Sequence, residues 1–253
     1  MHKVTVGKGA PALMIHCALS RHETMLPLAE ALGGQVTLFD MPGHGRSDEW
    51  DGKHDYQSLV VAAAAACCDG AAHLIGHSFG ATAALRLAVA RPALVNRLTL
   101  IEPVYLAAAK GPPQHAQHAK EFRPSAGAMP TGDEARAAEV FNALWGATPW
   151  ADIPVRMQAK LTQRIHLIVA GAAPIEEDAA GITSARRLGE LSIPVTLIRG
   201  ADTQPVIRAI HQVLAARIPN ATDHEIADAA HMVPLTHTDQ VAAIIRAADL
   251  NTD

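Results

Sequence analysis

Apolar positions along the chain form short continuous runs that alternate with amphipathic segments. The continuous runs are rich in leucine and β-branched residues, as strands buried on both faces are. They predict strands at residues 12–16, 36–39, 73–76, 97–101, 194–198 and 223–226. Between these runs, apolar residues recur every three or four positions, which predicts helices at residues 23–32, 56–68, 79–90, 206–218 and 239–248. This alternation is the order of a doubly wound, mostly parallel sheet of the α/β class.

Residues 104–189 interrupt the alternation. Prolines at positions 112, 113, 124, 130, 149 and 154 separate scattered helical turns there. The stretch is not a low-complexity linker, because apolar and aromatic residues recur along it. We therefore expect one α/β core, formed by residues 1–103 and 190–253, into which residues 104–189 are inserted as a mainly helical cap.

Composition and charge exclude several classes of protein. Of the 253 residues, 49% are hydrophobic and 18% are charged, which excludes a disordered chain. The 21 basic and 25 acidic residues give a formal charge of -4, so we expect no nucleic-acid partner and no membrane partner. The longest apolar run, residues 59–68, is far shorter than the roughly 20 residues that span a bilayer, and it predicts a buried helix.

Neither the amino terminus nor the cysteines indicate export. Residues 1–9 lack the extended hydrophobic stretch of a secretory signal. Of the three cysteines, Cys67 and Cys68 are adjacent, so they do not make a disulfide framework. We expect a cytoplasmic protein, whose oligomeric state does not follow from the sequence.

The strongest chemical signal is the pentapeptide Gly76-His77-Ser78-Phe79-Gly80, which lies between a predicted strand and a predicted helix. It matches the G-x-S-x-G nucleophile elbow, in which a serine on a sharp turn is held above the sheet edge. Glycines on either side let the strand and the helix approach without a clash of β-carbons. The helix amino terminus presents backbone N–H groups, beginning with that of Phe79, to an anion. The pattern predicts Ser78 as a nucleophile and Phe79 as half of an oxyanion hole.

A serine nucleophile needs a base, and His231 is the best placed of the 14 histidines. It follows the last predicted strand and precedes the final predicted helix, and loops at the carboxyl ends of strands form the crevice of such sheets. His237, at the start of that helix, is better explained as a packing or capping residue. We expect His231 to take the proton of Ser78.

Four motifs, in order over nearly the whole chain, resemble those of the α/β-hydrolase fold superfamily of esterases and lipases. They are Met14-Ile15-His16-Cys17-Ala18, which resembles the family's strand followed by His-Gly; residues 40–47, which resemble its D-x-x-G-x-G-x-S loop; the pentapeptide around Ser78; and Ala230-His231, which resembles its carboxyl-terminal Gly-His. The resemblance implies an α/β-hydrolase fold. By position, it implies that the backbone N–H groups of Ala18 and Phe79 are the oxyanion donors.

Cys17 departs from the family pattern, which usually has glycine at this position. A nucleophilic thiolate would need an activating positive partner, and His16 is the only local candidate. A small buried thiol is the better interpretation of Cys17.

Two carboxylates compete as the acid that orients His231. The family usually has this acid in a Gly-x-x-Asp turn after the strand at 194–198, but Gly200-Ala201-Asp202 carries it one position early. Some members, including the haloalkane dehalogenase branch, place the acid after the strand that follows the elbow helix, and Glu102 resembles that arrangement closely. Both keep the chain order nucleophile, acid, histidine. We favour Glu102, and Asp202 stays open as the alternative.

No motif predicts a metal or a cofactor. The sequence has no H-E-x-x-H motif and no cysteine and histidine cluster with zinc spacing, and we interpret His115 with His118 as a solvated helical face. Residues 7–9 lack the spacing of a phosphate-binding loop, and residues 43–45 lack the third glycine of a dinucleotide fingerprint. We expect no cofactor and no metal.

The resemblance implies a serine hydrolase that cleaves a small or medium carboxylic ester through an acyl-enzyme intermediate. A serine in place of an aspartate nucleophile disfavours dehalogenase and epoxide hydrolase chemistry. Two alternatives stay open. One is a thioesterase, lactonase or carbon–carbon hydrolase with the same residues, and the other is a non-catalytic protein that binds a small ligand in the same fold.

The cap is where we expect a small-molecule substrate to be selected. Its large apolar residues either line an acyl or alcohol pocket or simply pack the cap onto the core. They are Phe122, Met129, Phe141, Leu144, Trp145, Trp150 and Met157.

Overall fold

A seven-stranded sheet forms the centre of the computed structural model, which describes residues 1–250. The strand order is β1-β3-β2-β4-β5-β6-β7, and all neighbouring strands are parallel except β1 and β3. The strands are β1 (Lys3–Val6), β2 (Pro11–Ile15), β3 (Gln35–Phe39), β4 (Ala72–His77), β5 (Val95–Ile101), β6 (Val195–Gly200) and β7 (Ala221–Ile226). The expectation of a doubly wound, mostly parallel sheet is confirmed.

The sequence pattern missed the edge strand β1. Lys3 and Thr5 are exposed, whereas Val4 and Val6 are partly buried. An alternation of four residues is too short to distinguish a strand from a loop. The strand exists because its backbone pairs antiparallel with β3, a contact between segments far apart in the chain.

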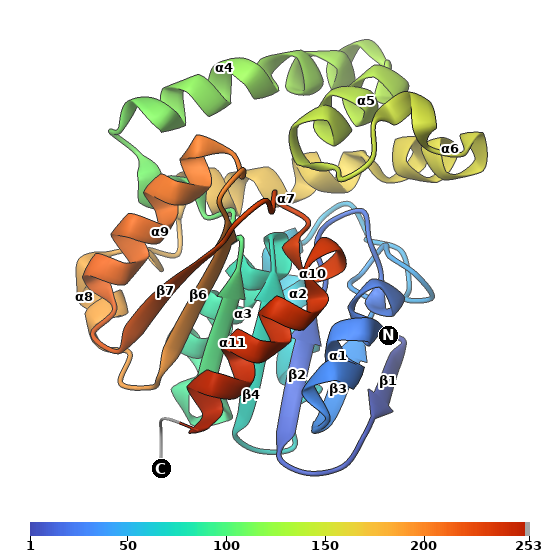
Figure 1. Cartoon of the computed structure of the whole chain (residues 1–253). Coiled ribbons are helices and arrows are strands. Elements are labelled where there is room, and N and C mark those ends of the chain that lie inside the picture. Colours follow the sequence, from blue (N-terminus) through green and yellow to red (C-terminus); the bar gives the residue numbers. More distant parts are fainter. Residues whose placement is uncertain (251–253) are drawn as a thin grey trace.

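Helices cover both faces of the sheet (Figure 1). On one face, α1 (Leu26–Leu32) packs against α11 (Thr238–Leu250). The other face carries α2 (Tyr56–Ala65), α3 (Phe79–Ala90) and α9 (Pro205–Arg217). Alternate residues of β2 show the division, because Leu13 and Ile15 pack with α2 and α3 while Met14 packs with α1 and α11. Burial on both faces is what makes the central strands continuously apolar in sequence.

Two predicted helices differ in detail from those observed. The helix expected from residue 23 begins as a short 3-10 helix, η1 (His22–Met25), before α1. The helix expected at 56–68 ends at Ala65. The alanine-rich run within it is not wholly buried as expected, because Ala62 and Ala66 are exposed on the side of α2 that faces away from the sheet.

The chain between β5 and β6 is mainly helical. Its elements are η3 (Leu106–Ala109), α4 (Pro113–Ala128), η4 (Met129–Thr131), α5 (Glu134–Trp145), η5 (Trp150–Asp152), α6 (Val155–Arg164), α7 (His166–Glu177) and α8 (Ala185–Gly189). In Figure 1, α4, α5, α6 and α7 form a layer beyond the carboxyl ends of the strands, whereas α8 packs against α9. The division into core and cap at residues 104–189 stays a prediction.

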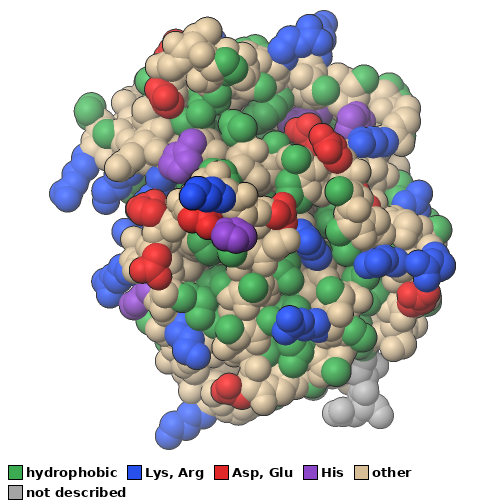
Figure 2. Space-filling view, turned by 180° about the vertical axis from the view of Figure 1, so that it is seen from behind, with side chains coloured by type: hydrophobic (Ala, Val, Ile, Leu, Met, Phe, Trp, Pro, Cys, Tyr) green, Lys and Arg blue, Asp and Glu red, His purple; other side chains and the backbone are tan. Residues whose placement is uncertain are grey.

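Basic and acidic side chains are interspersed on the face of the molecule seen in Figure 2, and neither sign of charge forms a large patch there. This distribution accords with the formal charge of -4. None of the helices within residues 1–250 is long and apolar enough to cross a membrane.

Candidate active site

Ser78 occupies a strained turn between β4 and α3. Its φ of 56° and ψ of -118° are unusual for a residue with a side chain. A β-carbon on Gly76 would lie 2.5 Å from the Cα of Ala81, and one on Gly80 would lie 2.4 Å from the carbonyl oxygen of Ile15. The two glycines are therefore required for the close approach of the elbow helix to β4 and to the end of β2.

His231 lies in the loop between β7 and the short helix α10 (Val233–Thr236). Its Nε2 is 2.9 Å from the hydroxyl oxygen of Ser78. Its Nδ1 is 2.9 Å from Oε2 of Glu102, at the end of β5. Because a carboxylate only accepts hydrogen bonds, Nδ1 carries the proton and Nε2 is free to accept the Ser78 hydroxyl proton. Three residues far apart in sequence thus form one hydrogen-bonded relay.

Glu102 is completely buried and is held by more than His231. Its Oε1 accepts a hydrogen bond of 2.7 Å from the backbone N–H of Gly200, and its Oε2 accepts one from the hydroxyl of Thr203. Burial by itself acts to raise the pKa of Glu102, but the bond and the charge of His231, with the bonds from Thr203 and Gly200, hold the pKa below its ordinary value. An ionised carboxylate is therefore stable at this depth.

Asp202 does not approach His231 in this relay. Its side chain is exposed, and its backbone N–H donates to the carbonyl oxygen of Ala229 at 2.9 Å. A β-carbon on Gly200 would lie 2.0 Å from the same carbonyl oxygen. The turn at 200–203 thus packs against the loop that carries His231, and it supports Glu102 through Gly200 and Thr203. No pattern in the sequence indicates that these two residues support Glu102.

His77 is a second residue whose part in the site the sequence did not reveal, although it lies within the elbow motif. It is fully buried, and burial lowers its pKa to about 3. The ring is therefore neutral, and its Nε2 donates to the backbone carbonyl of His231 at 2.9 Å. The Trp145 ring packs edge-on against the His231 ring, with 4.6 Å between centroids. His237, by contrast, is hydrogen-bonded to Thr236 at the end of α10.

Ala18 and Phe79, the expected oxyanion donors, lie at the same cavity as Ser78. Phe79 is the first residue of α3, and Ala18 follows the end of β2. Cys17 is buried, and burial raises the pKa of its thiol to about 11. Burial also lowers the pKa of His16 to about 4, so His16 offers no positive charge. These shifts oppose a Cys17 thiolate.

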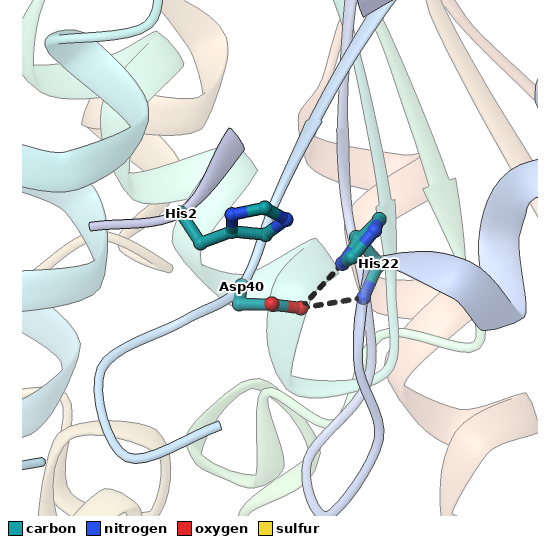
Figure 3. A group of neighbouring side chains, drawn as sticks. All are labelled: His2, His22 and Asp40. Carbon is teal, nitrogen blue, oxygen red and sulfur yellow. Dashed lines mark hydrogen bonds and ion pairs between the residues drawn. The ribbon is translucent and has the colours of Figure 1, made fainter. Parts of the chain in front are cut away.

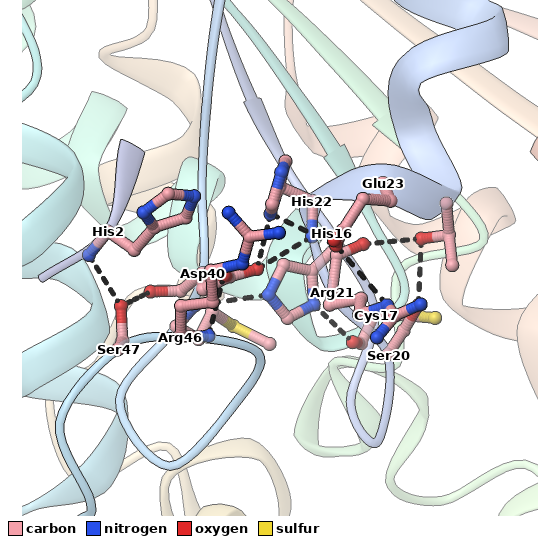
Figure 4. A network of polar contacts seen from close by, with 12 residues as sticks. His2, His16, Cys17, Ser20, Arg21, His22, Glu23, Asp40, Arg46 and Ser47 are labelled. Atoms are coloured by element: carbon pink, nitrogen blue, oxygen red, sulfur yellow. Dashed lines mark hydrogen bonds and ion pairs between the residues drawn. The ribbon is translucent and has the colours of Figure 1, made fainter. Parts of the chain in front are cut away.

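A polar network holds the turn that carries Ala18 (Figure 4). The His16 ring donates from Nδ1 to the Cys17 carbonyl at 2.7 Å and accepts from the Met41 N–H at 3.1 Å. The carboxylate of Asp40, the residue before Met41, accepts hydrogen bonds from the backbone N–H of Arg46 and from both the backbone N–H and Nδ1 of His22. The loop at 40–47 is thereby fixed against the turn after β2.

The best arrangement for a metal among residues 1–250 is His2, His22 and Asp40, which come together from three segments (Figure 3). Their ligand atoms lie within 4.8 Å of one another. Asp40 Oδ1, however, already accepts two hydrogen bonds of 2.8 Å from His22. His22 and Asp40 thus belong to the network that fixes the 40–47 loop, whereas Nε2 of His2 is buried without a hydrogen-bond partner within residues 1–250, and we assign no metal to the group.

Two cavities meet at Ser78. The smaller, of about 60 Å³, extends between α3, α4 and α7, and the larger, of about 410 Å³, opens beside α5 and α6. Ser78, Ala18 and Trp145 line both. Phe79 borders the smaller cavity and His231 the larger. The nucleophile candidate therefore stands at a junction between two differently shaped spaces.

Some of the large apolar residues of the segment at 104–189 line these two cavities, and the others only pack against apolar neighbours. Phe141 and Trp145 line both cavities, Phe122 lines the smaller and Met157 the larger. The others pack elsewhere: Leu144 lies against the main core, and Met129 and Trp150 lie in a separate apolar cluster.

His118 corrects one expectation. It was expected on a solvated helical face with His115, but only 6% of it is exposed and it lines the smaller cavity. The exposed face of α4 instead carries Gln117 and Lys120. Residue type alone therefore does not tell which polar residues of α4 are exposed. His118 is buried because its ring packs against the rings of Phe122 and Trp145.

Comparison with known proteins agrees with this fold. Residues 12–244 match the model of the alpha/beta hydrolase family, and the chain belongs to that family. It is 28% identical to lipase LipV of Mycobacterium tuberculosis over 97% of this chain and 96% of the relative. It is also 28% identical to the pimeloyl-[acyl-carrier protein] methyl ester esterase of Methylococcus capsulatus, over 83% of this chain and 82% of the relative.

A solved structure shares the whole fold. An alpha/beta hydrolase from Sphaerobacter thermophilus superimposes with a TM-score of 0.73 and 23% identity, covering 98% of this chain and 95% of that one. The expected class, a hydrolase enzyme of the α/β-hydrolase fold, is confirmed.

Proposed function

We propose that this protein is a serine hydrolase that cleaves small or medium carboxylic esters through an acyl-enzyme intermediate. The observation that carries the proposal is the relay in which Ser78 contacts His231 and His231 contacts a buried, ionised Glu102. A hydroxyl, an imidazole and a carboxylate in this order have the geometry of an activated serine. The names of the two relatives, a lipase and a methyl ester esterase, support the ester as the substrate class.

In the proposed reaction, Ser78 attacks the acyl carbonyl while His231 Nε2 takes the hydroxyl proton. The backbone N–H groups of Ala18 and Phe79 stabilise the oxyanion of the tetrahedral intermediate. Collapse of this intermediate expels the alcohol, which receives its proton from His231. Water, deprotonated by His231, then attacks the acyl group and releases the acid and Ser78.

Glu102 is the proposed acid. It keeps the His231 ring in the tautomer whose Nε2 faces Ser78, and its negative charge stabilises the imidazolium that forms. Asp202 has an exposed side chain and its turn supports the loop of His231 through backbone contacts. We therefore assign Asp202 a structural part in the turn at 200–203.

Residues 104–189 are the proposed cap. None of the proposed catalytic groups comes from it, yet Trp145 and other residues of the segment form walls of both cavities. We infer that the cap selects the substrate while the core, residues 1–103 and 190–253, performs the chemistry in the cytoplasm. A thioester, a lactone or a carbon–carbon bond next to a carbonyl would use the same three residues, and a panel of substrates distinguishes these classes.

The proposal is tested with a fluorophosphonate probe and p-nitrophenyl esters. Mass spectrometry should locate the probe on Ser78, and short p-nitrophenyl esters should be hydrolysed. Ser78→Ala should abolish labelling and turnover while the fold stays intact by circular dichroism, and His237→Ala serves as the matched histidine control. An adduct on Cys17, or a folded protein that neither reacts with the probe nor turns over any ester, would leave the binding-protein alternative.

A further inference from the structure

The two cavities at Ser78 differ in their relation to His231, and this difference assigns the two halves of an ester. The alcohol that leaves must receive its proton from His231, so it must face the cavity that His231 borders. Within residues 1–250, His231 lines the larger cavity and not the smaller one. This step rests on the proposed function. It places the alcohol in the larger cavity and the acyl group in the smaller one.

The smaller cavity admits only a short acyl group. Its volume is about 60 Å³, compared with about 410 Å³ for the other cavity. Phe79, Leu167 and Ile175 form apolar walls. The wall at α7 is already tight, because a β-carbon on Gly171 would lie 2.6 Å from Cε2 of Phe79.

His118 is the exception to the apolar lining. Its Nδ1 is buried and has no hydrogen-bond partner within the described part of the chain. The ring is held in place by stacking on Phe122 at 5.8 Å and by an edge contact with Trp145 at 5.3 Å between centroids. A buried polar atom without a partner is costly, and a ligand group that completes its hydrogen bonding removes that cost.

The charge of the surroundings limits what this ligand group is. Burial lowers the pKa of His118 to about 4, so the ring is neutral at physiological pH. A neutral imidazole offers one N–H donor and one nitrogen acceptor. The carboxyl of Glu176 also lines this cavity, and burial raises its pKa. A carboxylate on the acyl chain would lose solvation here and would meet no cation among the lining residues.

We propose that the smaller cavity binds a short acyl group that carries a neutral hydrogen-bonding group, a carbonyl or a hydroxyl, at its far end, and that His118 recognises this group. The Trp145 ring packs against both His118 and His231. Because Ser78 and His118 line the same cavity, an acyl group on Ser78 extends toward His118 within it. The substrate class is an oxo- or hydroxyacyl ester of a larger alcohol.

Pairs of p-nitrophenyl esters that differ only at the end of the acyl chain test the proposal. Each pair has an alkyl chain of five or six carbons and the same chain with a keto group on its penultimate carbon, far enough from the ester carbonyl not to activate it. We expect kcat/KM to be up to about tenfold higher for the keto ester at the chain length that reaches His118, as one hydrogen bond allows. A matching ω-carboxylate ester should be the poorest substrate.

Three variants separate recognition from general damage. In His118→Leu, the ratio of keto to alkyl kcat/KM should fall to about one, and His118→Gln, which keeps a donor, should restore part of it. His115→Leu, one turn away on α4, is the control and should retain the wild-type ratio. Equal loss for both esters in His118→Leu would overturn the role of His118, because a merely structural residue moves both rates together.

The assignment of the two cavities has its own test. Gly171→Ala narrows the smaller cavity, so it should shift the preference to shorter acyl chains without altering the preference among alcohols. A shift in the preference among alcohols instead would reverse the assignment. In each case, fluorophosphonate labelling of Ser78 is measured in parallel. If Ser78 is labelled but kcat/KM does not depend on the acyl group, only this inference is refuted. If Ser78 of the wild-type protein is not labelled at all, the proposed function is refuted.

Discussion

Nδ1 of His231 lies 2.9 Å from Oε2 of Glu102, although the two residues are 129 positions apart in the chain. Gly200 and Thr203, the residues that flank Asp202, both donate hydrogen bonds to the same Glu102 carboxylate. The turn that the usual family pattern would use for the acid thus supports a carboxylate from another strand, the proposed acid Glu102.

Glu102→Gln should be far more damaging than Asp202→Asn. The amide removes the charge that stabilises the imidazolium and no longer selects one tautomer of His231, which costs about ten-thousand-fold in kcat in the known protease case. Asp202→Asn alters an exposed side chain and should stay close to wild type. Both variants are assayed on one ester, with circular dichroism as the check on folding. The reverse ranking would make Asp202 the acid.

Gly80→Ala should destabilise the elbow. The added β-carbon would lie 2.4 Å from the carbonyl oxygen of Ile15, which is backbone and cannot rotate away. We expect the free energy of unfolding in urea to fall by about 1–3 kcal/mol, as overpacking usually costs. Gly127→Ala is the matched control, because its new β-carbon would meet no atom within 4 Å beyond its chain neighbours and the backbone of its own helix. A Gly80→Ala protein as stable as wild type would contradict the close contact of α3 with β2.

Trp145→Ala should change the ranking of ester substrates, and Trp150→Ala should not. Trp145 lines both cavities and contacts His231, whereas Trp150 packs in a separate apolar cluster. The readout is kcat/KM over a series of acyl chain lengths. Fluorophosphonate labelling of Ser78 should persist in both variants, since neither tryptophan supplies a proposed catalytic group. Loss of labelling in a folded variant would show that such a group had been missed.

Stability should fall as the pH is lowered from about 6.5 toward 4, because several buried or mostly buried histidines are neutral in the folded protein. In the folded state their pKa values are lowered by burial to about 3 or 4, below the 6.5 of an exposed histidine. The unfolded chain therefore binds these protons first. Each histidine removes about 1.4 kcal/mol of stability per pH unit in this window. They are His16, His44, His73, His77 and His118.

Urea unfolding at pH 7.5, 6 and 5 measures this loss. His73→Gln removes one such group and should flatten the dependence, while the exposed His166→Gln should leave it unchanged. A free energy of unfolding that stays constant from pH 7.5 to 5 would show that the buried histidines do not resist protonation.

The sequence could predict those features that depend on neighbouring residues. Continuous apolar runs marked the central strands because both faces of the sheet are covered. Gly76 marked the elbow, because the clash that it avoids is with Ala81 in the adjoining helix. His231 was recognised from its place after the last strand. Each of these signals is local, so it survives in a one-dimensional pattern.

Only the tertiary structure decided which side chains face one another across the sheet. Glu102 and Asp202 both follow strands in the right chain order, and the packing of Gly200 and Thr203 brought Glu102 to His231. The burial of His118 likewise depends on Trp145 of α5, which no pattern within α4 reveals. Neighbours from distant segments set burial, hydrogen bonding and pKa. A pattern within one segment therefore determines what a residue can do chemically, but not the partner with which it does so.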